Sequence, residues 1–311
     1  MTGVVVLLLF VCPSSLAIVS KDFKANSFHD DKLFNDSLVS ESPSMSVLYC
    51  ASMCGPNCSY YGFNFKTKKC RAHTCFALVN SVEEEGWRYY SSNDLDCKPK
   101  DCQAVYQAGH RRSGVYRIYP SGGASTDVIC DMETIGGGWT NIQNRFDGSV
   151  NFNRTWNDYK NGFGSATGEY WIGNDVIHEL TKTNTSSLYV SITLTNNTTL
   201  FELYETFSVS SENDNYRLFV EGQASGTLGN MMVLSSDPHY TNKGMVFSTL
   251  DRDNDNSPNT NCASSWKGGW WFNRCSLVFL NGPYASSSWE HPWKPLKGDM
   301  IKKTSMLLRR R

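Results

Sequence analysis

Residues 251–275 read DRDNDNSPNTNCASSWKGGWWFNRC and join an acidic loop to an aromatic segment bounded by two cysteines. The loop, Asp251–Asn261, carries three carboxylates among amides and turn-forming residues. Carboxylates crowded together disfavour their own ionisation unless a cation lies nearby. Ca²⁺ takes about 6–8 oxygen ligands, which a curled loop can supply from side chains and carbonyls. The loop therefore predicts a calcium site, with a solvated acidic loop as the open alternative.

The loop does not have the EF-hand pattern. An EF-hand needs Gly at its sixth position and Glu at its twelfth. Counted from Asp251, these positions hold Asn256 and Cys262. Magnesium is less suitable because it demands a tight octahedron and favours phosphate-bearing substrates, for which the chain has no recognition motif. We therefore expect a calcium loop of another type.

The same stretch resembles the fibrinogen C-terminal domain family of ficolins, tachylectins and angiopoietins. Its matching motifs are Phe247–Asp255, the Cys262–Cys275 segment and Leu280–Tyr284. Further motifs match in register upstream: Asp101-Cys102, Gly114–Tyr116, Cys130–Met132, Gly138–Thr140, Arg145–Phe152, Trp156, Tyr159–Gly164 and Glu169–Asn174. The resemblance covers about two thirds of the chain. It implies an α+β fold, with a central antiparallel sheet and long loops, over residues 102–311.

The resemblance implies two disulfides and a set of calcium ligands. The disulfides are Cys102–Cys130 and Cys262–Cys275. The calcium ligands are the side chains of two aspartates and two later carbonyl oxygens, namely Asp253, Asp255, Ser257 and Asn259. The loop is one residue longer than the usual family pattern before its cysteine. The carbonyl ligands could therefore shift to Pro258 and Thr260.

Family lectins bind acetyl groups beside this ion, in a pocket made by aromatic rings and by backbone at a cis peptide bond. By position this peptide bond is Arg274–Cys275. The predicted ligand-binding residues are Trp266, Arg274, Cys275, Ser276 and Trp289. Trp266 stands where a family lectin has a pocket tyrosine, and ordinary core packing is its alternative role.

Two departures from the family concern this pocket. Ser276 replaces a histidine that binding members often carry, so no pH-switched release is predicted. The stretch between Tyr284 and Trp289 is shorter than in many relatives and usually supplies another wall. Trp289 and Trp293 could fill that place, or the pocket could be open or lost.

The N-terminus predicts secretion. Residues 1–17 combine an apolar run, Val4–Val11, with small residues before Ala17, which is typical of a signal peptide. A membrane anchor is the competing interpretation, although the run is too short to span a bilayer. Removal of Cys12 with the signal leaves ten cysteines, an even number that suits disulfides in an extracellular protein. Zinc is less favoured because Cys50, Cys54 and Cys58 are separated by three residues rather than two.

Cysteine density divides the chain. Six cysteines lie between Cys50 and Cys97, which predicts a small disulfide-rich module over 18–97, with its core at about 44–97, a linker at 98–101 and the larger domain at 102–311. This module resembles an apple/PAN domain through Ser46–Cys50, Cys54, Cys58, Gly62–Phe65 and Cys70. Such modules bind proteins or carbohydrates. The alternative is that this module is a spacer stabilised by its disulfides.

Local patterns predict several elements. Leu188, Val190, Ile192 and Leu194 alternate with polar or amphipathic residues, and residues 216–220 repeat the alternation, as antiparallel strands do. Residues 174–180 predict an amphipathic helix. In the front module, residues 60–65 predict a half-buried strand and residues 50–54 a short helix.

Six asparagines stand in N-x-S/T sequences, which are possible glycan acceptors in a secreted chain. They are Asn35, Asn57, Asn153, Asn184, Asn196 and Asn197. Because Asn196 and Asn197 are adjacent, this pair could carry a single glycan.

These features predict a secreted, calcium-stabilised recognition protein, lectin-like and binding acetylated glycans in innate immunity. The alternative is a receptor-binding or extracellular-matrix protein without sugar specificity. Clotting members grip a basic peptide with acidic groups, and Ser265 and Trp266 stand at those positions here. We expect no enzyme, because His178-Glu179 lacks the second helical histidine of a zinc protease and no G-x-S-x-G or phosphate loop occurs.

The partners expected from sequence are glycans or acetylated compounds, and a cell-surface receptor or other proteins through the apple/PAN-like module. A net charge of -1 disfavours nucleic acid. A homo-oligomer is possible, although no heptad or collagen-like stalk is visible.

Overall fold

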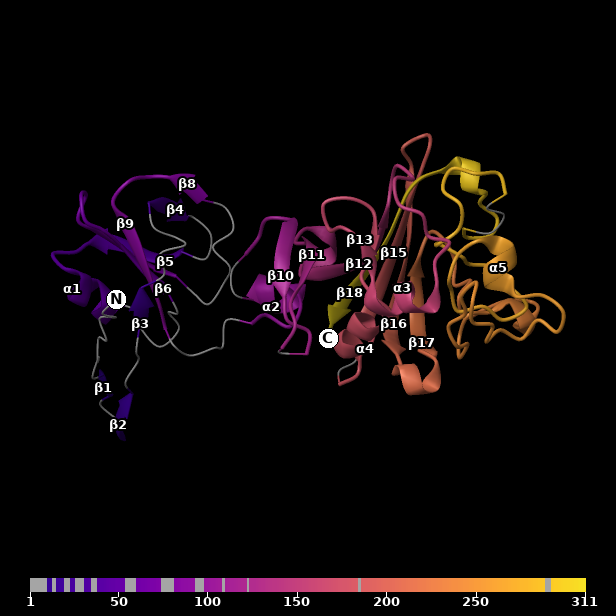
Figure 1. The fold of residues 1–311 in the computed structure, drawn as a ribbon, viewed down its shortest axis with the longest axis horizontal. Coiled ribbons are helices and arrows are strands. Elements are labelled where there is room, and N and C mark those ends of the chain that lie inside the picture. Colours follow the sequence, from indigo (N-terminus) through magenta and orange to yellow (C-terminus); the bar gives the residue numbers. More distant parts are fainter. Residues whose placement is uncertain are drawn as a thin grey trace. The chain divides into compact units, whose positions relative to one another are not determined.

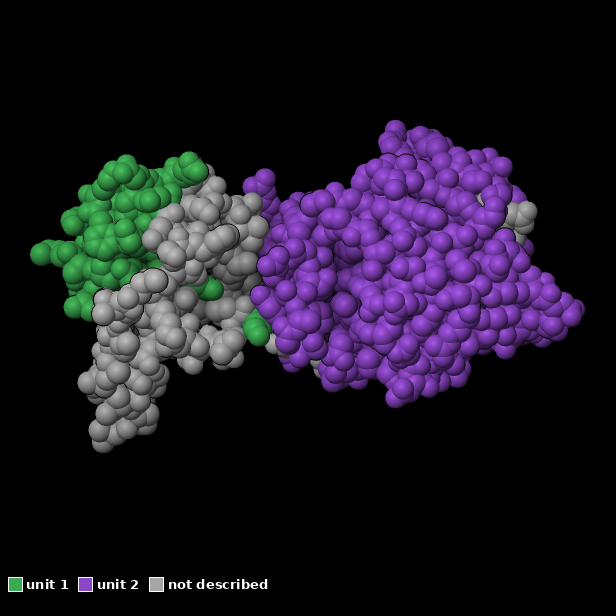
Figure 2. Space-filling model, in the orientation of Figure 1, with its two compact units in different colours: residues 1–99, 104–111 green, residues 100–103, 112–311 purple. Residues whose placement is uncertain are grey.

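The computed structural model describes most of the chain (Figure 1). The described residues are 10–12, 15–19, 23–25, 31–34, 38–53, 60–73, 81–92, 98–107, 110–121, 123–183, 186–288 and 292–311. They form two compact units, coloured separately in Figure 2. One unit comprises residues 1–99 and 104–111, and the other comprises residues 100–103 and 112–311. No helix among the described residues is long and apolar enough to cross a bilayer.

The N-terminal unit contains a five-stranded sheet in the order β3-β9-β6-β7-β5. Its strands are β3 (Phe23–Ala25), β5 (Leu38–Pro43), β6 (Tyr60–Asn64), β7 (Lys69–His73) and β9 (Trp87–Ser92). Two further pairs are β1 (Phe10–Cys12) with β2 (Ser15–Val19), and β4 (Lys32–Phe34) with β8 (Ser81–Glu83). The predicted signal peptide overlaps β1, β2 and residues outside the described part, and it stays a prediction.

The short helix α1 (Val47–Met53) begins three residues before the predicted one, and a Cys50–Cys70 disulfide joins it to β7. The prediction that residues 60–65 form a half-buried strand is wrong in its burial, because Tyr61–Asn64 are all buried. Tyr61 and Phe63 pack with Cys50 of α1. On the other face, a side chain at Gly62 would collide with the Tyr89 ring, 2.5 Å from an ideal Cβ. Both faces of β6 are therefore covered.

The C-terminal unit is built on a nine-stranded sheet whose main path is β10-β11-β12-β18-β15-β16-β17. Its strands are β10 (Gly114–Ile118), β11 (Thr126–Asp131), β12 (Trp139–Arg145), β13 (Phe163–Gly164), β14 (Tyr170–Trp171), β15 (Ser186–Leu194), β16 (Thr199–Val209), β17 (Leu218–Gly226) and β18 (Ile301–Arg310). The helices from the unit boundary onward are α2 (Cys102–Gln107), α3 (Trp156–Asn161), α4 (Asn174–Thr181) and α5 (Cys262–Trp266). Single 3-10 turns lie at Thr134–Gly136, Glu212–Asp214, Pro238–Tyr240 and Gly298–Met300.

The last strand of the chain lies in the middle of this sheet. β18 pairs antiparallel with β12 on one side and β15 on the other (Figure 1). In β15 the predicted alternation is confirmed, because Leu188, Val190 and Ile192 are buried while Tyr189 and Ser191 are partly exposed. The sheet therefore has a core face and a second, more polar face.

Two other predictions can be compared directly. Helix α4 confirms the amphipathic helix, and it is fixed to β16 by the Val209 N–H, which donates to Thr181 Oγ1 at 3.2 Å. The strand predicted over residues 216–220 is wrong at its start. Tyr216 has a φ of 52° in the preceding turn, so β17 begins only at Leu218.

Candidate functional site

The acidic loop Asp251–Asn261 is anchored where it begins. Asp251 Oδ1 accepts hydrogen bonds from the Trp156 backbone N–H at 2.8 Å and from Thr249 Oγ1 at 2.7 Å. Arg252 Nη2 donates to Asn215 Oδ1 at 2.7 Å, and its guanidinium lies 3.9 Å from the Trp156 ring centroid. Asp251 and Arg252 therefore fix the loop to the fold.

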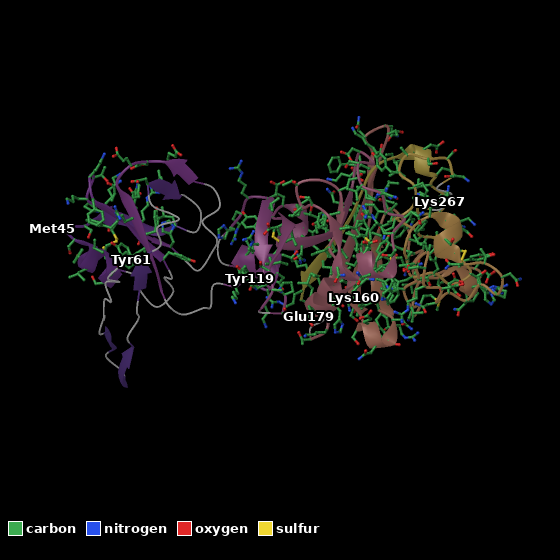
Figure 3. All side chains as sticks on the ribbon, viewed as in Figure 1. Met45, Tyr61, Tyr119, Lys160, Glu179 and Lys267 are labelled. Carbon is green, nitrogen blue, oxygen red and sulfur yellow. A yellow bond between two sulfur atoms is a disulfide. The ribbon has the colours of Figure 1, made fainter. Side chains whose placement is uncertain are left out.

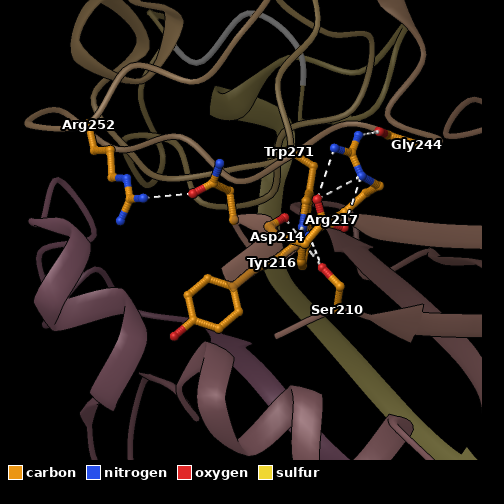
Figure 4. Close-up of polar contacts among 8 residues, drawn as sticks. Ser210, Asp214, Tyr216, Arg217, Gly244, Arg252 and Trp271 are labelled. Carbon is orange, nitrogen blue, oxygen red and sulfur yellow. Dashed lines mark hydrogen bonds and ion pairs between the residues drawn. The ribbon is translucent and has the colours of Figure 1, made fainter. Parts of the chain in front are cut away.

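The turn that receives Arg252 also holds the aromatic segment (Figure 4). Arg217 donates to the Asp214 carboxylate and to the Gly244 carbonyl, which closes the turn between β16 and β17. Trp271 Nε1 donates to the Tyr216 carbonyl at 2.7 Å. One turn thus positions both the start of the acidic loop and the centre of the Cys262–Cys275 segment.

Asp253 and Asp255 lie together in the middle of the loop. Asp255 Oδ1 accepts from the Ser257 N–H and Oδ2 from the Cys262 N–H, both at 2.8 Å. Burial raises the pKa of the Asp255 carboxyl, and the neighbouring Asp253 carboxylate raises it further. Such a pair is electrostatically unfavourable by itself and would be relieved by a cation.

The oxygens around this pair suit a hard cation. Within the described residues, no hydrogen bond reaches the carbonyl oxygens of residues 257–260, which include both alternative pairs of predicted carbonyl ligands. No group of three or more His, Cys, Asp or Glu side chains that could hold a metal occurs in the described part of the chain. A site here therefore depends on two carboxylates and backbone oxygens, a donor set that Ca²⁺ accepts. The oxygen donors of this loop therefore fit a calcium ion.

The loop is bonded to both ends of the disulfide-closed segment. At the first end, Asp255 holds the N–H of Cys262. Near the second end, the Asn256 N–H donates to the Asn273 carbonyl, and Asn256 Nδ2 donates to Asn273 Oδ1, both at 3.0 Å. The Cys262–Cys275 disulfide closes the segment. The position of the acidic loop is therefore tied by hydrogen bonds to Cys262 and Asn273 of this segment.

A second strip of chain, which the sequence analysis missed, packs against residues 273–277. The Arg274 N–H donates to the His239 carbonyl at 2.9 Å, and Asn273 Nδ2 donates to the Pro238 carbonyl at 3.0 Å. Asp237 caps this strip and forms a 2.7 Å contact with His239 Nδ1. Hydrogen bonds from the backbone and ring of His239 lower the pKa of Asp237. Nothing in the sequence pairs two strips 35 residues apart.

The predicted pocket residues lie in different environments. Trp266 is partly exposed and packs edge-on against Phe272 at 5.7 Å and tilted against Phe279 at 5.9 Å, measured between ring centroids. Figure 3 labels Lys267, which follows Trp266 at the end of α5. Arg274 is exposed and Cys275 half-buried. The Arg274–Cys275 peptide bond is cis, as the resemblance implies.

Ser276 and Trp293 face the interior. Ser276 is 1% exposed, and its hydroxyl accepts from Asn242 Nδ2 and donates to the Val278 carbonyl. That hydroxyl is unavailable to a ligand. Trp293 is fully buried and donates to the Leu228 carbonyl, so it belongs to the core rather than to a pocket wall. Trp289 lies outside the described residues.

Of the other predicted positions, Asn153, Asn196 and Asn197 are exposed. Asn35, Asn57 and Asn184 lie outside the described residues, as do Cys54, Cys58, Cys75 and Cys97. The second implied disulfide, Cys102–Cys130, is present and joins α2 to β11.

Comparison with known proteins assigns the family. The family model described as "Fibrinogen beta and gamma chains, C-terminal globular domain" matches residues 98–311. The chain belongs to this family. The chain is 42% identical to human fibroleukin over 214 residues, which cover 67% of this chain and 48% of that protein. The chain spans about half the length of the curated relatives it matches.

Solved structures of this family have the same fold. The fibrinogen-like globe domain of human ANGPTL6 is 36% identical, with a TM-score of 0.61, over 68% of this chain and 96% of that one. Lamprey fibrin D-dimer, complexed with the peptide Gly-His-Arg-Pro-amide, is also 36% identical with a TM-score of 0.61, over 68% of this chain and 73% of that one. The predicted fibrinogen-like fold with an antiparallel sheet is confirmed.

Proposed function

We propose that the C-terminal unit is a calcium-stabilised recognition domain that binds acetylated glycans beside the Cys262–Cys275 segment. One observation carries this proposal: the acidic loop is bonded to both ends of that segment, through Asp255 to Cys262 and through Asn256 to Asn273. An ion that orders the loop would also order the surface around Arg274. The role is binding without catalysis.

Calcium would be held by Asp253, Asp255 and the carbonyls of Ser257 and Asn259, with Pro258 and Thr260 as the alternative carbonyls. Bound there, the ion supplies positive charge that lets both carboxylates stay ionised side by side. The protein's own contribution is positional. Asp255 keeps its two backbone hydrogen bonds and so couples the loop to the start of α5.

The surface beside the loop has groups that suit an acetamido group. Trp266, supported by Phe272 and Phe279, offers a partly exposed ring on which a methyl group can pack. In the described part of the chain, the backbone N–H of Cys275 donates no hydrogen bond to a protein acceptor. That N–H is available to a ligand carbonyl. Ser276 contributes no side chain to this surface.

We further propose that the protein is secreted, acts in innate immunity and gains avidity by association. A single shallow glycan site binds weakly, and linking several sites raises the overall affinity without new contacts. The N-terminal unit, proposed to be an apple/PAN-like module, is the part of the chain that could provide this association.

The second candidate function is recognition of a protein without sugar specificity. It is favoured by the lamprey fibrin structure, which shares the fold and is complexed with a basic peptide. A basic peptide needs an acidic partner, and Ser265 and Trp266 provide none at the corresponding positions. A protein ligand would therefore have to be recognised by other chemistry.

Capture on N-acetylglucosamine-agarose separates these two functions. We expect retention in calcium and release by EDTA. Trp266→Ala should weaken binding about tenfold or more, because truncating an aromatic anchor commonly costs over 1 kcal/mol. The matched control is Phe219→Ala, which removes an exposed ring of β17 and should bind normally. Equal elution of wild type and Trp266→Ala from the acetylated resin and from unmodified agarose would favour protein recognition instead.

A further inference from the structure

A hollow of about 350 Å³ lies on the polar face of the central sheet, away from the core face of β15. It is lined by residues of β11, β12, β15, β16 and β18, including Asn141, Asn144, Tyr189, Ser191, Thr199 and Ser305. We call it the sheet-face hollow. Its volume is within the range, about 300–1,000 Å³, of cavities that bind small molecules.

An aromatic platform borders the sheet-face hollow. Tyr189 stacks on Phe201 with ring centroids 5.4 Å apart and an interplanar angle of 18°, and Trp139 packs on Tyr189 at 5.8 Å. Tyr189 and Phe201 are both partly exposed. A stacked pair on an otherwise polar sheet face offers a flat apolar surface to a ligand.

Two residues that line the sheet-face hollow have buried side-chain acceptors without donors. Asn141 and Asn144 are each 4% exposed, and neither Oδ1 atom has a hydrogen-bond partner in the described residues. Asn144 Nδ2 donates to the Gly168 carbonyl at 3.0 Å, which fixes the orientation of that amide. An unpaired buried acceptor costs about 1–3 kcal/mol, and both Oδ1 atoms are closed off from solvent, so a ligand would meet them only after the side chains turn towards the hollow.

The few charged groups that line this region do not select a strongly charged ligand. The Asp131 carboxylate already accepts from the Glu133 N–H, the Thr134 N–H and Thr134 Oγ1. The hollow is also lined by one further acid and one base, Glu133 and Lys303, whose charges oppose each other, and by hydroxyls such as the Ser191–Ser305 pair at 2.7 Å. A saccharide combines many O–H donors with an apolar face and so matches both halves of the hollow.

The chain itself carries candidate saccharide positions at the edge of the sheet-face hollow. Asn196 and Asn197 are exposed in the turn between β15 and β16, and both stand in N-x-T sequences. Thr199, the third residue of the Asn197 sequence, lines the hollow. Lys302 Nζ donates to Asn197 Oδ1 at 2.6 Å, which joins the turn to β18 beside Lys303, another lining residue.

We propose that an N-linked glycan on Asn196 or Asn197 folds back along the strands and packs into the sheet-face hollow. The strand rise is about 3.3 Å per residue, so the five residues from Asn196 to Ser191 span about 17 Å, a distance that a few sugar rings can cover. The first sugars would lie past the Thr193–Thr199 hydroxyl pair, and the next would reach the Tyr189 ring.

The test uses full-length protein secreted from eukaryotic cells, with glycopeptide mass spectrometry and endoglycosidase digestion under native conditions. We expect a glycan at Asn196 or Asn197 to be released about tenfold more slowly than one at Asn153, because exposing a contact worth about 1.4 kcal/mol reduces the accessible population tenfold. Denaturation should abolish this difference. Tyr189→Ala should bring the native release rate close to that at Asn153, whereas the control Phe219→Ala should not.

Two results would overturn the proposal. One is that neither Asn196 nor Asn197 carries a glycan in the secreted protein. The other is that the glycan on the turn is released at the same rate from native and from denatured wild-type protein. This comparison uses only the wild-type chain, so it does not depend on how the Tyr189 variant folds. Because acetylated-resin capture reports on Trp266, failure of this proposal leaves the proposed lectin function untouched.

Discussion

Asp253→Asn is expected to lose the calcium-dependent rise in melting temperature while remaining at least as stable as wild type without calcium. Free calcium at about 100 times its dissociation constant stabilises the native state by about 2.7 kcal/mol. For a domain of this size that corresponds to a rise of about 5–10 °C. Without the ion, Asp253 only adds repulsion to Asp255, apart from a long 3.3 Å hydrogen bond from the Asp255 N–H.

Thermal unfolding in calcium and in EDTA measures both halves of this expectation. Asp253→Asn combined with Asp255→Asn should also show no calcium response, but this variant should melt lower in EDTA, because Asp255 holds the Ser257 and Cys262 N–H groups. Asp299→Asn, an exposed acid on another loop, is the matched control and should respond to calcium like wild type. Identical melting curves for the wild type in calcium and EDTA would rule out the site.

Sequence patterns predicted those elements of the fold whose burial follows from the order of residues within the element itself. The alternation over 188–194 predicts β15 because one face of that strand packs on the core, and the period of two shows in the sequence itself. The same argument fails for β6, where a helix on one face and Tyr89 on the other bury every residue from Tyr61 to Asn64. Burial on two faces erases the period that identifies a half-exposed strand.

Contacts between distant segments could not be predicted from periodicity. Nothing in residues 301–310 indicates that this strand lies between β12 and β15. At the candidate site, crowded carboxylates indicated the loop that holds Asp253 and Asp255. Two hydrogen bonds at the site, from Arg252 to Asn215 and from Arg274 to His239, depend on tertiary packing. The spacing of residues in the sequence does not predict either of them. The interior position of Ser276 is explained by its bond from Asn242, 34 residues earlier.

Glu169→Ala is expected to cost about 4 kcal/mol or more of unfolding free energy. Glu169 is 1% exposed, and its carboxylate accepts backbone N–H bonds from Phe146, Asp147, Gly148 and Val150, at 2.6, 2.9, 2.8 and 3.3 Å. These residues form the loop that follows β12. The loop residues are themselves exposed or partly exposed, but their N–H groups point at the buried Glu169 carboxylate, and each donor left there without an acceptor costs about 1–3 kcal/mol.

A second cost comes from Arg145, which is buried beside the same loop with its guanidinium 4.2 Å from the Phe152 ring centroid. Burial lowers the pKa of Arg145 to about 10, and the negative charge of Glu169 opposes that shift. Without Glu169, the buried cation loses this compensation. Glu169→Gln keeps one acceptor oxygen but no charge, so we expect it to be intermediate between wild type and Glu169→Ala.

Urea unfolding followed by tryptophan fluorescence measures these differences, with Glu133→Ala, an exposed acid of the same unit, as the matched control. The loop after β12 holds its acceptor whether or not an ion occupies Asp253 and Asp255. Glu169→Ala should therefore lose stability by the same amount in calcium and in EDTA, and its own calcium response should match that of wild type. A loss within about 1 kcal/mol of Glu133→Ala would mean that water satisfies the four N–H groups and that the carboxylate does not organise the loop.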